Sequence, residues 1–119
     1  MDSKLDIGSI KWVEGKVRGF HGKPLIDLNN GTVKLIRVDP GADYPQHRHP
    51  DKTEYAYVVE GCLEFTIGGD VYTGKAGDFY IFPCNTLHAI RNKTNNEGLM
   101  LIGAIKETTN ELHSTISRP

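Results

Sequence analysis

The sequence predicts an all-β domain built as a sandwich or a barrel. Short apolar stretches recur along the chain, and glycine, proline and asparagine residues that favour turns separate them. Many short strands with such turns between them are typical of closed or two-layered β folds. No good amphipathic helical stretch occurs before the C-terminal tail. We therefore expect a single domain over residues 1–119, with an N-terminal arm over 1–23 and a tail over 106–119.

The first part of the chain predicts an arm followed by a hairpin. Residues 12–20 are expected to form a weak strand or an arm, and residues 24–28 a short extended piece. The sequence Asn29-Asn30-Gly31 predicts a tight turn, because Asn-Gly supplies the positive φ values of a hairpin. This turn leads into a strand over residues 32–38, which ends at the Asp-Pro-Gly sequence that follows.

The remainder of the chain predicts a close succession of strands. These are expected over residues 54–60, 62–67, 71–73, 79–82, 87–91 and 99–105. The first two flank Gly61 and are interpreted as a pair. In the second of them, alternation places Leu63 and Phe65 inward and Glu64 outward. The last strand is apolar on both faces, which predicts that the N-terminal arm or a partner subunit covers it.

Charge and composition exclude some classes of partner. The formal net charge is -1, and no run of lysine or arginine forms the basic stripe that nucleic-acid binding requires. The start of the chain lacks the pattern of a secretory signal, and no apolar stretch is long enough for a membrane-spanning helix. We therefore expect no nucleic-acid partner, no membrane association and a cytoplasmic location. Cys62 and Cys84 are too few for a disulfide framework.

Three histidines and one glutamate are the candidate functional residues. His47 and His49 are two residues apart, and alternate side chains on a strand point to the same face. A bend over residues 50–52, if it folds the chain back as a hairpin, would return the Glu54 carboxylate to them. His88 lies much further along the chain, so only a closed or sandwiched sheet would bring it to the same place.

Three imidazoles and a carboxylate point to a transition metal. Such donors suit divalent Mn, Fe, Co, Ni, Cu or Zn, whereas Ca and Mg prefer shells of oxygen atoms. A His-x-His pair alone is more often a polar surface pair, but the chain has 5 histidines and places three of them at these positions. Cys84 is interpreted as a small wall residue rather than a soft metal ligand. The remaining alternative is a barrel that binds a metal adventitiously and performs no chemistry.

The spacing of these residues resembles the paired motifs of the cupin superfamily. The first motif is matched by Gly41, His47, His49, Glu54 and Gly61, and the second by Gly77, Pro83, His88 and Asn92. The resemblance covers residues 41–92 and implies a cupin double-stranded β-helix, a small jelly-roll-like barrel. It also implies that His47, His49, Glu54 and His88 bind the metal and leave coordination positions open for water or substrate. Cupins are often dimers, so the resemblance favours a homodimer.

Three further residues need separate interpretation. Asn85 stands where the family usually has glycine, but asparagine tolerates the left-handed backbone better than other residues with a β-carbon, so we expect the turn to survive. Arg37 would point inward and anchor a substrate carboxylate if Val33 and Leu35 point inward. An outward Arg37 in a surface ion pair is the equal alternative. His21 is interpreted as an exposed loop residue.

Such a site favours small chelating anions as substrates. Three neutral imidazoles and one carboxylate around a divalent ion leave a net charge of about +1, which attracts an enolate, an oxo acid or a hydroxy acid. With iron, copper, nickel or manganese the open positions suit oxygenase chemistry, and with zinc or manganese they suit Lewis-acid chemistry. Our first hypothesis is a metal-dependent dioxygenase-type enzyme acting on an enol-like or oxo-acid substrate. A lyase or isomerase acting on a sugar acid (uronate) is the second, and a non-catalytic small-molecule-binding protein is the third.

Overall fold

The computed structural model describes residues 2–107 and is built almost wholly from strands. Over these residues the strands are β1 (Val13–Glu14), β2 (Phe20–Leu28), β3 (Gly31–Val38), β4 (Asp43–His47), β5 (Lys52–Glu60), β6 (Cys62–Ile67), β7 (Asp70–Lys75), β8 (Phe79–Phe82), β9 (His88–Arg91) and β10 (Gly98–Lys106). A short 3-10 turn, Ile7–Ser9, precedes them. The predicted tail lies mostly outside the described residues, and its first residue, Lys106, is the last residue of β10.

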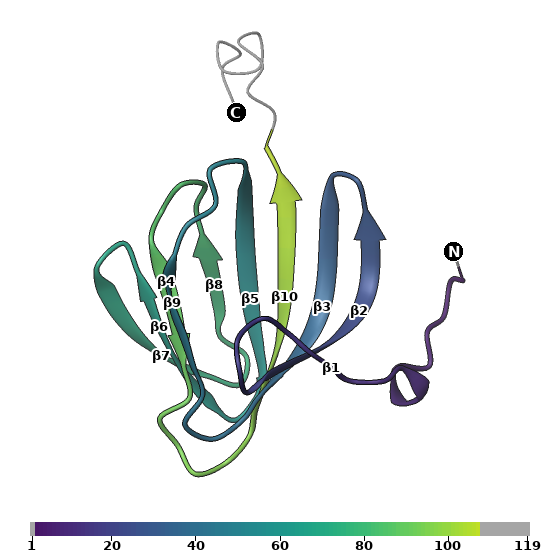
Figure 1. Cartoon of the computed structure of the whole chain (residues 1–119), viewed down its shortest axis with the longest axis horizontal. Helices are drawn as coiled ribbons and strands as arrows, with labels where there is room; N and C mark the ends of the chain where they lie inside the picture. The colour runs from purple at the N-terminus through teal and green to yellow at the C-terminus, as the bar shows by residue number, and fades with distance from the viewer. Residues whose placement is uncertain (1, 108–119) are drawn as a thin grey trace, which may run out of the picture.

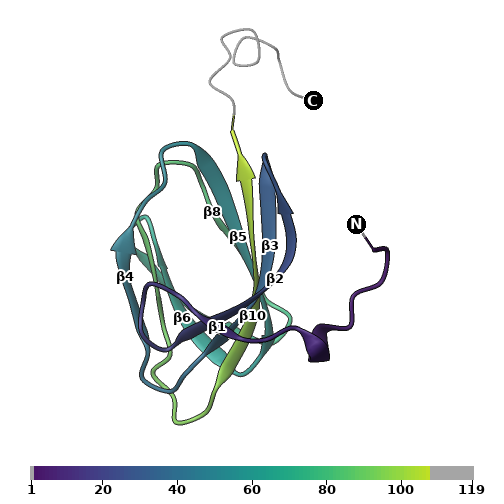
Figure 2. The ribbon, with the colours of Figure 1, turned by 45° about the vertical axis from the view of Figure 1, so that its right-hand side comes forward.

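The strands form two antiparallel sheets that face each other (Figures 1 and 2). The larger sheet has the order β1-β2-β3-β10-β5-β8, and the smaller has the order β4-β9-β6-β7. Neighbouring strands in each sheet are mostly distant in sequence, because the chain passes repeatedly from one sheet to the other. This arrangement is a double-stranded β-helix, and it confirms the predicted all-β, jelly-roll-like barrel.

Local turn signals identified some hairpins correctly and one incorrectly. The Asn-Gly turn joins β2 to β3, with Leu28 opposite Gly31, as predicted. The predicted pairing of 54–60 with 62–67 is wrong, because β5 belongs to the larger sheet and β6 to the smaller. Gly61, at φ 82°, makes this crossing, and an added β-carbon there would lie 2.8 Å from the carbonyl oxygen of Glu97. Its close contact with the chain before β10 therefore favours glycine at the crossing.

The core lies between the two sheets. Its largest fully buried side chains are Phe65, Phe82, Leu63, Met100, Val38, Val58 and Asn92. Burial of Leu63 and Phe65 confirms the alternation predicted for β6, and Glu64 forms an ion pair with Lys93 at 3.0 Å. Asn92 is polar, but its amide donates hydrogen bonds to the carbonyl oxygens of Val38 and Asn96. These bonds fix the loop before β10 against the end of β3.

The N-terminal segment covers part of the larger sheet. Lys23 on β2 and Arg37 on β3 both lie over the ring of Trp12, at 4.6 and 4.8 Å from its centroid. β1 then pairs with β2, and the segment around it reaches toward the smaller sheet (Figure 2). The arm therefore covers β2 and β3, whereas Ile105 on β10 is 57% exposed. Within residues 2–107, no helix has the length and apolar character needed to cross a membrane.

Candidate metal centre

The four predicted ligands converge on one point. Each of His47, His49, Glu54 and His88 offers a donor atom, and these atoms all lie within 4.8 Å of one another. His47 ends β4 and faces His88, which begins β9. Glu54 comes from β5 in the opposite sheet, so the group bridges both walls of the barrel. Only a sandwiched arrangement brings His88 to the other three, as the sequence predicted.

The path of the chain between the ligands differs from the prediction. β4 ends at His47, so His49 lies beyond the strand instead of on it. The bend over residues 50–52 does not fold back as a hairpin, because β4 and β5 belong to different sheets. Backbone contacts hold this crossing in place, since the Asn85 N–H donates to the carbonyl oxygen of His49 at 2.7 Å. His49 is therefore positioned by the turn that precedes β9.

Backbone carbonyls orient two of the imidazole rings. His47 Nδ1 lies 2.9 Å from the carbonyl oxygen of Pro45, and His88 Nδ1 lies 3.1 Å from that of Thr86. A carbonyl oxygen only accepts, so each Nδ1 donates a proton and each neutral ring carries its lone pair on Nε2. A metal-binding histidine typically has its other ring nitrogen fixed in this way, by a hydrogen bond to a carbonyl or a carboxylate.

The same tautomer assignment tests whether a metal fits. His88 Nε2 lies 3.2 Å from Glu54 Oε1, and His49 Nε2 lies 3.2 Å from the same oxygen. With Nδ1 donating to the carbonyl, this contact between His88 Nε2 and the carboxylate oxygen needs either a proton on Nε2, which makes it a hydrogen bond, or a metal cation between the two atoms, which takes the place of that proton. Donors at right angles about 2.1 Å from one ion would be about 3.0 Å apart. The observed separations therefore fit neighbouring ligands of a single metal ion.

Burial and charge favour the protonation states that metal binding needs. Burial lowers the pKa of His49, although the charge of Glu54 opposes this effect, so the ring stays neutral near neutral pH. Burial raises the pKa of Glu54, but the hydrogen bond with His88 and the charges of His49 and Lys52 outweigh it, and the net pKa is lowered. Glu54 is therefore an anion, and burial favours the neutral form of His49.

Packing holds His88 more firmly than His49. The His88 side chain is only 3% exposed, and its ring stacks on Phe82 with centroids 4.5 Å apart and planes 8° apart. The ring of Tyr44 contacts that of His47 at 4.7 Å. The His49 side chain is 30% exposed and lies outside any strand. Of the three histidines, His49 is therefore the one that can be replaced with the least damage to the core.

The turn before His88 has the predicted backbone conformation. Asn85 adopts φ 61° and is the one residue other than glycine with positive φ within the described chain. The same turn carries Cys84, whose thiol donates to the carbonyl oxygen of Pro50 at 3.0 Å. Cys84 is absent from the group of metal donors. Both residues thus connect this turn to the chain that carries His49.

A cavity of about 570 Å³ lies beside the four ligands. The four candidate ligands form part of its wall, together with apolar side chains from both sheets, which include Phe20, Tyr44, Phe82, Ile90, Met100 and Ile102. The segment of residues 13–17 lines it from the N-terminal side. A metal ion held by the four donors would therefore have one side open to a small molecule.

The sequence also matches a family model, that of the cupin domain, over residues 34–102. This stretch is more than half of the chain and contains all four ligands. The chain belongs to the cupin family. Its cupin core extends from β3 into β10, and β1 and β2 lie before it.

Individual relatives show what this cupin resembles. A germin-like protein (subfamily 2 member 2) of Arabidopsis thaliana is 34% identical over 92 residues, which cover 71% of this chain and 42% of that protein. Quercetin 2,3-dioxygenase of Bacillus subtilis (strain 168) is 30% identical over 87 residues, 73% of this chain and 26% of that enzyme. The chain thus spans less than half of either relative. A solved structure titled as a predicted oxalate decarboxylase from Thermotoga maritima superposes with a TM-score of 0.80 at 21% identity, covering 87% of this chain and 98% of that one, and supports the fold alone.

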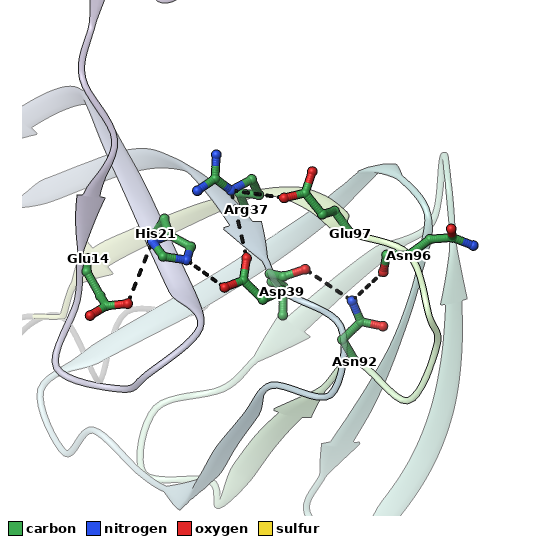
Figure 3. Close-up of polar contacts among 8 residues, drawn as sticks. Glu14, His21, Arg37, Asp39, Asn92, Asn96 and Glu97 are labelled. Carbon is green, nitrogen blue, oxygen red and sulfur yellow. Dashed lines mark hydrogen bonds and ion pairs between the residues drawn. The ribbon is translucent and has the colours of Figure 1, made fainter.

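In this cupin, Arg37 lies away from the metal centre. The cavity is lined by Thr32, Lys34 and Ile36 of β3, so Arg37, at the alternate parity, faces the outside of the sheet. The inward placement of Val33 and Leu35, on which the anchor hypothesis depended, is wrong. Arg37 forms the ion pair with Glu97 that is drawn in Figure 3, with Nε 3.4 Å from the carboxylate. Its guanidinium also lies over Trp12. The structure therefore places Arg37 in the outward ion pair that was the alternative.

His21 also differs from its interpretation as an exposed loop residue. It lies in β2, and its side chain is 15% exposed. Its Nε2 lies 2.9 Å from Asp39 and its Nδ1 lies 3.9 Å from Glu14, so it connects the N-terminal segment to the end of β3 (Figure 3). The role of His21 is therefore to hold β1 in place.

Sequence reasoning missed three lysines that line the cavity, Lys16, Lys34 and Lys52. Lys52 lies two residues before Glu54 and therefore on the same face of β5. Lys34 lies on the cavity face of β3, two residues from Thr32 and from Ile36. If the inward face of β3 had been assigned correctly, Lys34 would have been the candidate substrate anchor in place of Arg37. Among residues 2–107, none of the three forms an ion pair within 4.0 Å. The cavity is therefore more cationic than the sequence suggested.

Proposed function

We propose that the protein is a metal-dependent enzyme of the dioxygenase type that acts on a small, chelating enol-like or oxo-acid substrate. The observation that carries this proposal is the position of the four converging donors in the wall of the cavity. His47, His49, Glu54 and His88 would hold a divalent first-row metal, namely Mn, Fe, Co, Ni, Cu or Zn. When bound, the metal supplies open coordination positions for a chelating substrate and for dioxygen.

The chain's own residues would bind and orient the substrate. Apolar side chains such as Phe82, Met100 and Ile102 limit the water in the cavity and so strengthen electrostatic attraction at the ligands. Around a divalent ion, neutral imidazoles and the single Glu54 carboxylate would leave the site with a net charge of about +1, which favours an anion that presents two oxygen atoms. The fixed rings of His47 and His88 keep the donors in place during substrate exchange.

The similarity to quercetin 2,3-dioxygenase supports the oxidative branch of cupin chemistry. The match spans 73% of this chain but represents only 26% of that enzyme. The enzyme's name states an oxygen-consuming reaction. We infer a reaction of the same type here, and leave the identity of the substrate to experiment.

Elemental analysis of the protein purified without a histidine tag tests this function. Stoichiometric iron or copper, together with oxygen uptake in the presence of a diketone or a flavonol, is the expected result. His49→Ala should abolish both the metal and the oxygen uptake, whereas Arg48→Ala, at the exposed residue between the two histidines, should retain both. A metal-loaded protein that consumes no oxygen with either compound would contradict the proposal.

The second candidate is a metal-dependent lyase or isomerase acting on a sugar acid. Lys34 and Lys52 favour it, because they place groups other than the metal ligands in the cavity that can transfer protons or bind acids. Zinc or manganese in the purified protein, with loss of the absorbance of an unsaturated uronate under anaerobic conditions, would support this candidate. A protein that binds such compounds and converts none of them would instead be a non-catalytic binding protein.

A further inference from the structure

We propose that the cavity selects substrates with two anionic groups and that Lys34 binds the group distant from the metal. This inference rests on the proposed function for the first anionic group, which would chelate the metal. Lys34 would supply the second contact, to a carboxylate or a phosphate. Lys34 thus takes the anchoring role that the sequence suggested for Arg37, whose side chain faces away from the cavity.

The charges around the cavity support this selection. Its lining contains the lysines Lys16, Lys34 and Lys52, and Glu14 is the one carboxylate in it besides Glu54. Glu14 is directed toward His21 at 3.9 Å and is 59% exposed. The lysines form no ion pair within the described chain. A substrate with a single negative charge on the metal would leave this surplus positive charge unbalanced.

The strand register gives the spacing between the two anionic groups. Glu54, Ala104 and Thr32 lie in one row across β5, β10 and β3. The next row inward contains Ala56, Ile102 and Lys34. Lys34 thus lies two strands across and one same-face position along from Glu54, or roughly 12 Å between Cα atoms at ordinary strand spacing. Both side chains line the same cavity, so a small molecule in it can contact Lys34 at one end and the candidate metal ligands at the other.

The surface between these two positions is apolar. Ile102 and Ala104 of β10 lie between Lys34 and Glu54, and both line the cavity. A substrate would therefore place its chelating end at the ligands, a short hydrocarbon segment over β10, and its second anionic group at Lys34. A small molecule with an oxo acid at one end and a carboxylate two methylenes away has this form.

Lys34 is a better test position than the other two lysines. Lys52 influences the pKa values of Glu54 and His49, so replacing it would also alter the metal ligands. Lys16 lies in the segment before β2, whose position depends on His21 and Glu14. Lys34 lies within β3 between two paired strands, and its side chain is exposed to the cavity, so its replacement leaves the wall intact.

Calorimetric titration of the cobalt-loaded protein with matched acids tests the proposal. One pair is 2-oxobutanoate and 2-oxoglutarate, which differ by a distant carboxylate; the other is glycerate and 3-phosphoglycerate, which differ by a phosphate. We expect the acid with the second anionic group, in at least one pair, to bind roughly tenfold or more tightly than its partner, as a charge-assisted hydrogen bond would provide. The pair that shows this preference identifies the distant group as a carboxylate or a phosphate.

Variants at two lysines assign the preference to a residue. Lys34→Met should remove it and leave the binding of the singly charged acid unchanged, whereas Lys34→Arg should retain it. Lys75→Met is the matched control, because Lys75 is exposed on β7 and absent from the cavity lining. Equal binding within both pairs, no measurable binding of either acid that carries the second anionic group, or a preference that survives Lys34→Met would each overturn the proposal.

The same titrations separate this inference from the proposed function. If the preference for the second anionic group depends on Lys34 but persists in protein stripped of metal and in His49→Ala, the metal-chelating function is wrong and the Lys34 site stands. If binding depends on both the metal and Lys34 but no oxygen is consumed, the dioxygenase assignment alone is wrong. If both acids of each pair bind equally and only through the metal, the function stands and the Lys34 site is wrong.

Discussion

His47 and His88 lie directly opposite each other on β4 and β9, with their ring centroids 4.2 Å apart. Each ring has its Nδ1 beside the carbonyl oxygen of the residue two positions earlier, Pro45 for His47 and Thr86 for His88. Both Nε2 atoms are therefore presented by the backbone of a single sheet. Glu54 and His49 complete the group from the opposite wall and from the connection to it.

Replacing His49 with alanine should reduce metal affinity by roughly a hundredfold or more, because loss of even a supporting contact around a metal ligand costs tenfold to a hundredfold. The His49 side chain is 30% exposed and outside the strands, so the free energy of unfolding in EDTA should change by less than about 1 kcal/mol. Equilibrium dialysis and urea unfolding measure the two quantities. Unchanged occupancy, with Arg48→Ala as control, would mean that the ligand set is wrong.

Acidification should release the metal. Metal binding requires neutral imidazoles, so protons compete more strongly as the pH falls. Because burial lowers the pKa of His49, with Glu54 opposing it, this competition begins at a lower pH than at an exposed histidine. Occupancy should stay constant between about pH 8 and 7 and fall below about pH 6, as measured by dialysis and elemental analysis. Metal lost already above pH 7, or fully retained at pH 4, would contradict this prediction.

Arg37→Ala should destabilise the protein without weakening anion binding. The substitution removes the contact with Trp12 and the ion pair with Glu97, which together contribute about 1 kcal/mol at a partly exposed site. Urea unfolding measures this loss, and Arg18→Ala, at an exposed position before β2, is the control. Weaker binding of 2-oxoglutarate by Arg37→Ala, at unchanged stability, would restore Arg37 as the substrate anchor.

Asn85 should tolerate glycine and reject β-branched residues. At φ 61° a β-carbon costs about 1–2 kcal/mol for most residues, and asparagine reduces this cost. Asn85→Gly should leave the free energy of unfolding nearly unchanged, and Asn85→Val should lower it by about 1–2 kcal/mol. Because the Asn85 N–H also holds the His49 carbonyl, Asn85→Val should weaken metal binding as well. Thermal unfolding measures the stability of the two variants, and metal titration measures their metal affinity. Equal stability and equal metal affinity of Asn85→Gly and Asn85→Val would contradict the prediction.

The outer face of the larger sheet favours a homodimer. Cross-strand neighbours Tyr57 and Phe79 are 39% and 54% exposed, and Ile81, opposite Tyr55, is 56% exposed. We propose that a second copy of the chain covers this face. Light scattering in dilute solution should give the mass of a dimer, and Ile81→Glu should give that of a monomer. Val71→Glu, at an exposed apolar residue on the other sheet, should remain dimeric; a monomeric mass for the unmodified protein would contradict the proposal.

The metal ligands could be predicted from the sequence because their identity and spacing are local properties. His47, His49, Glu54 and His88 stand at the spacing of the two cupin motifs, and the structure brings their donor atoms within 4.8 Å of one another. The route of the chain between them could not be predicted. A bend after His49 is compatible with a hairpin or with a crossing between sheets, and only contacts with the distant residues 83–86 decide between them.

Which face of β3 points into the cavity could not be predicted, for a different reason. Both faces of this strand carry apolar residues, with Val33 and Leu35 on one and Ile36 and Val38 on the other, so alternation gives no direction. The Trp12 ring determines the outcome, because it covers Arg37 from outside the sheet. The partner of β5 was mistaken on similar grounds, since Gly61 resembles a hairpin turn until its contact with Glu97 is known.

The division of the four donors between two sheets has a thermodynamic consequence. An ion shared by β4, β9 and β5 would act as a cross-link between opposite walls, and its binding free energy would add directly to that of folding. Metal supply would then control how long the protein survives as well as whether it works. A cell short of the metal would accumulate chains whose two walls open more often, and proteolysis would remove these first.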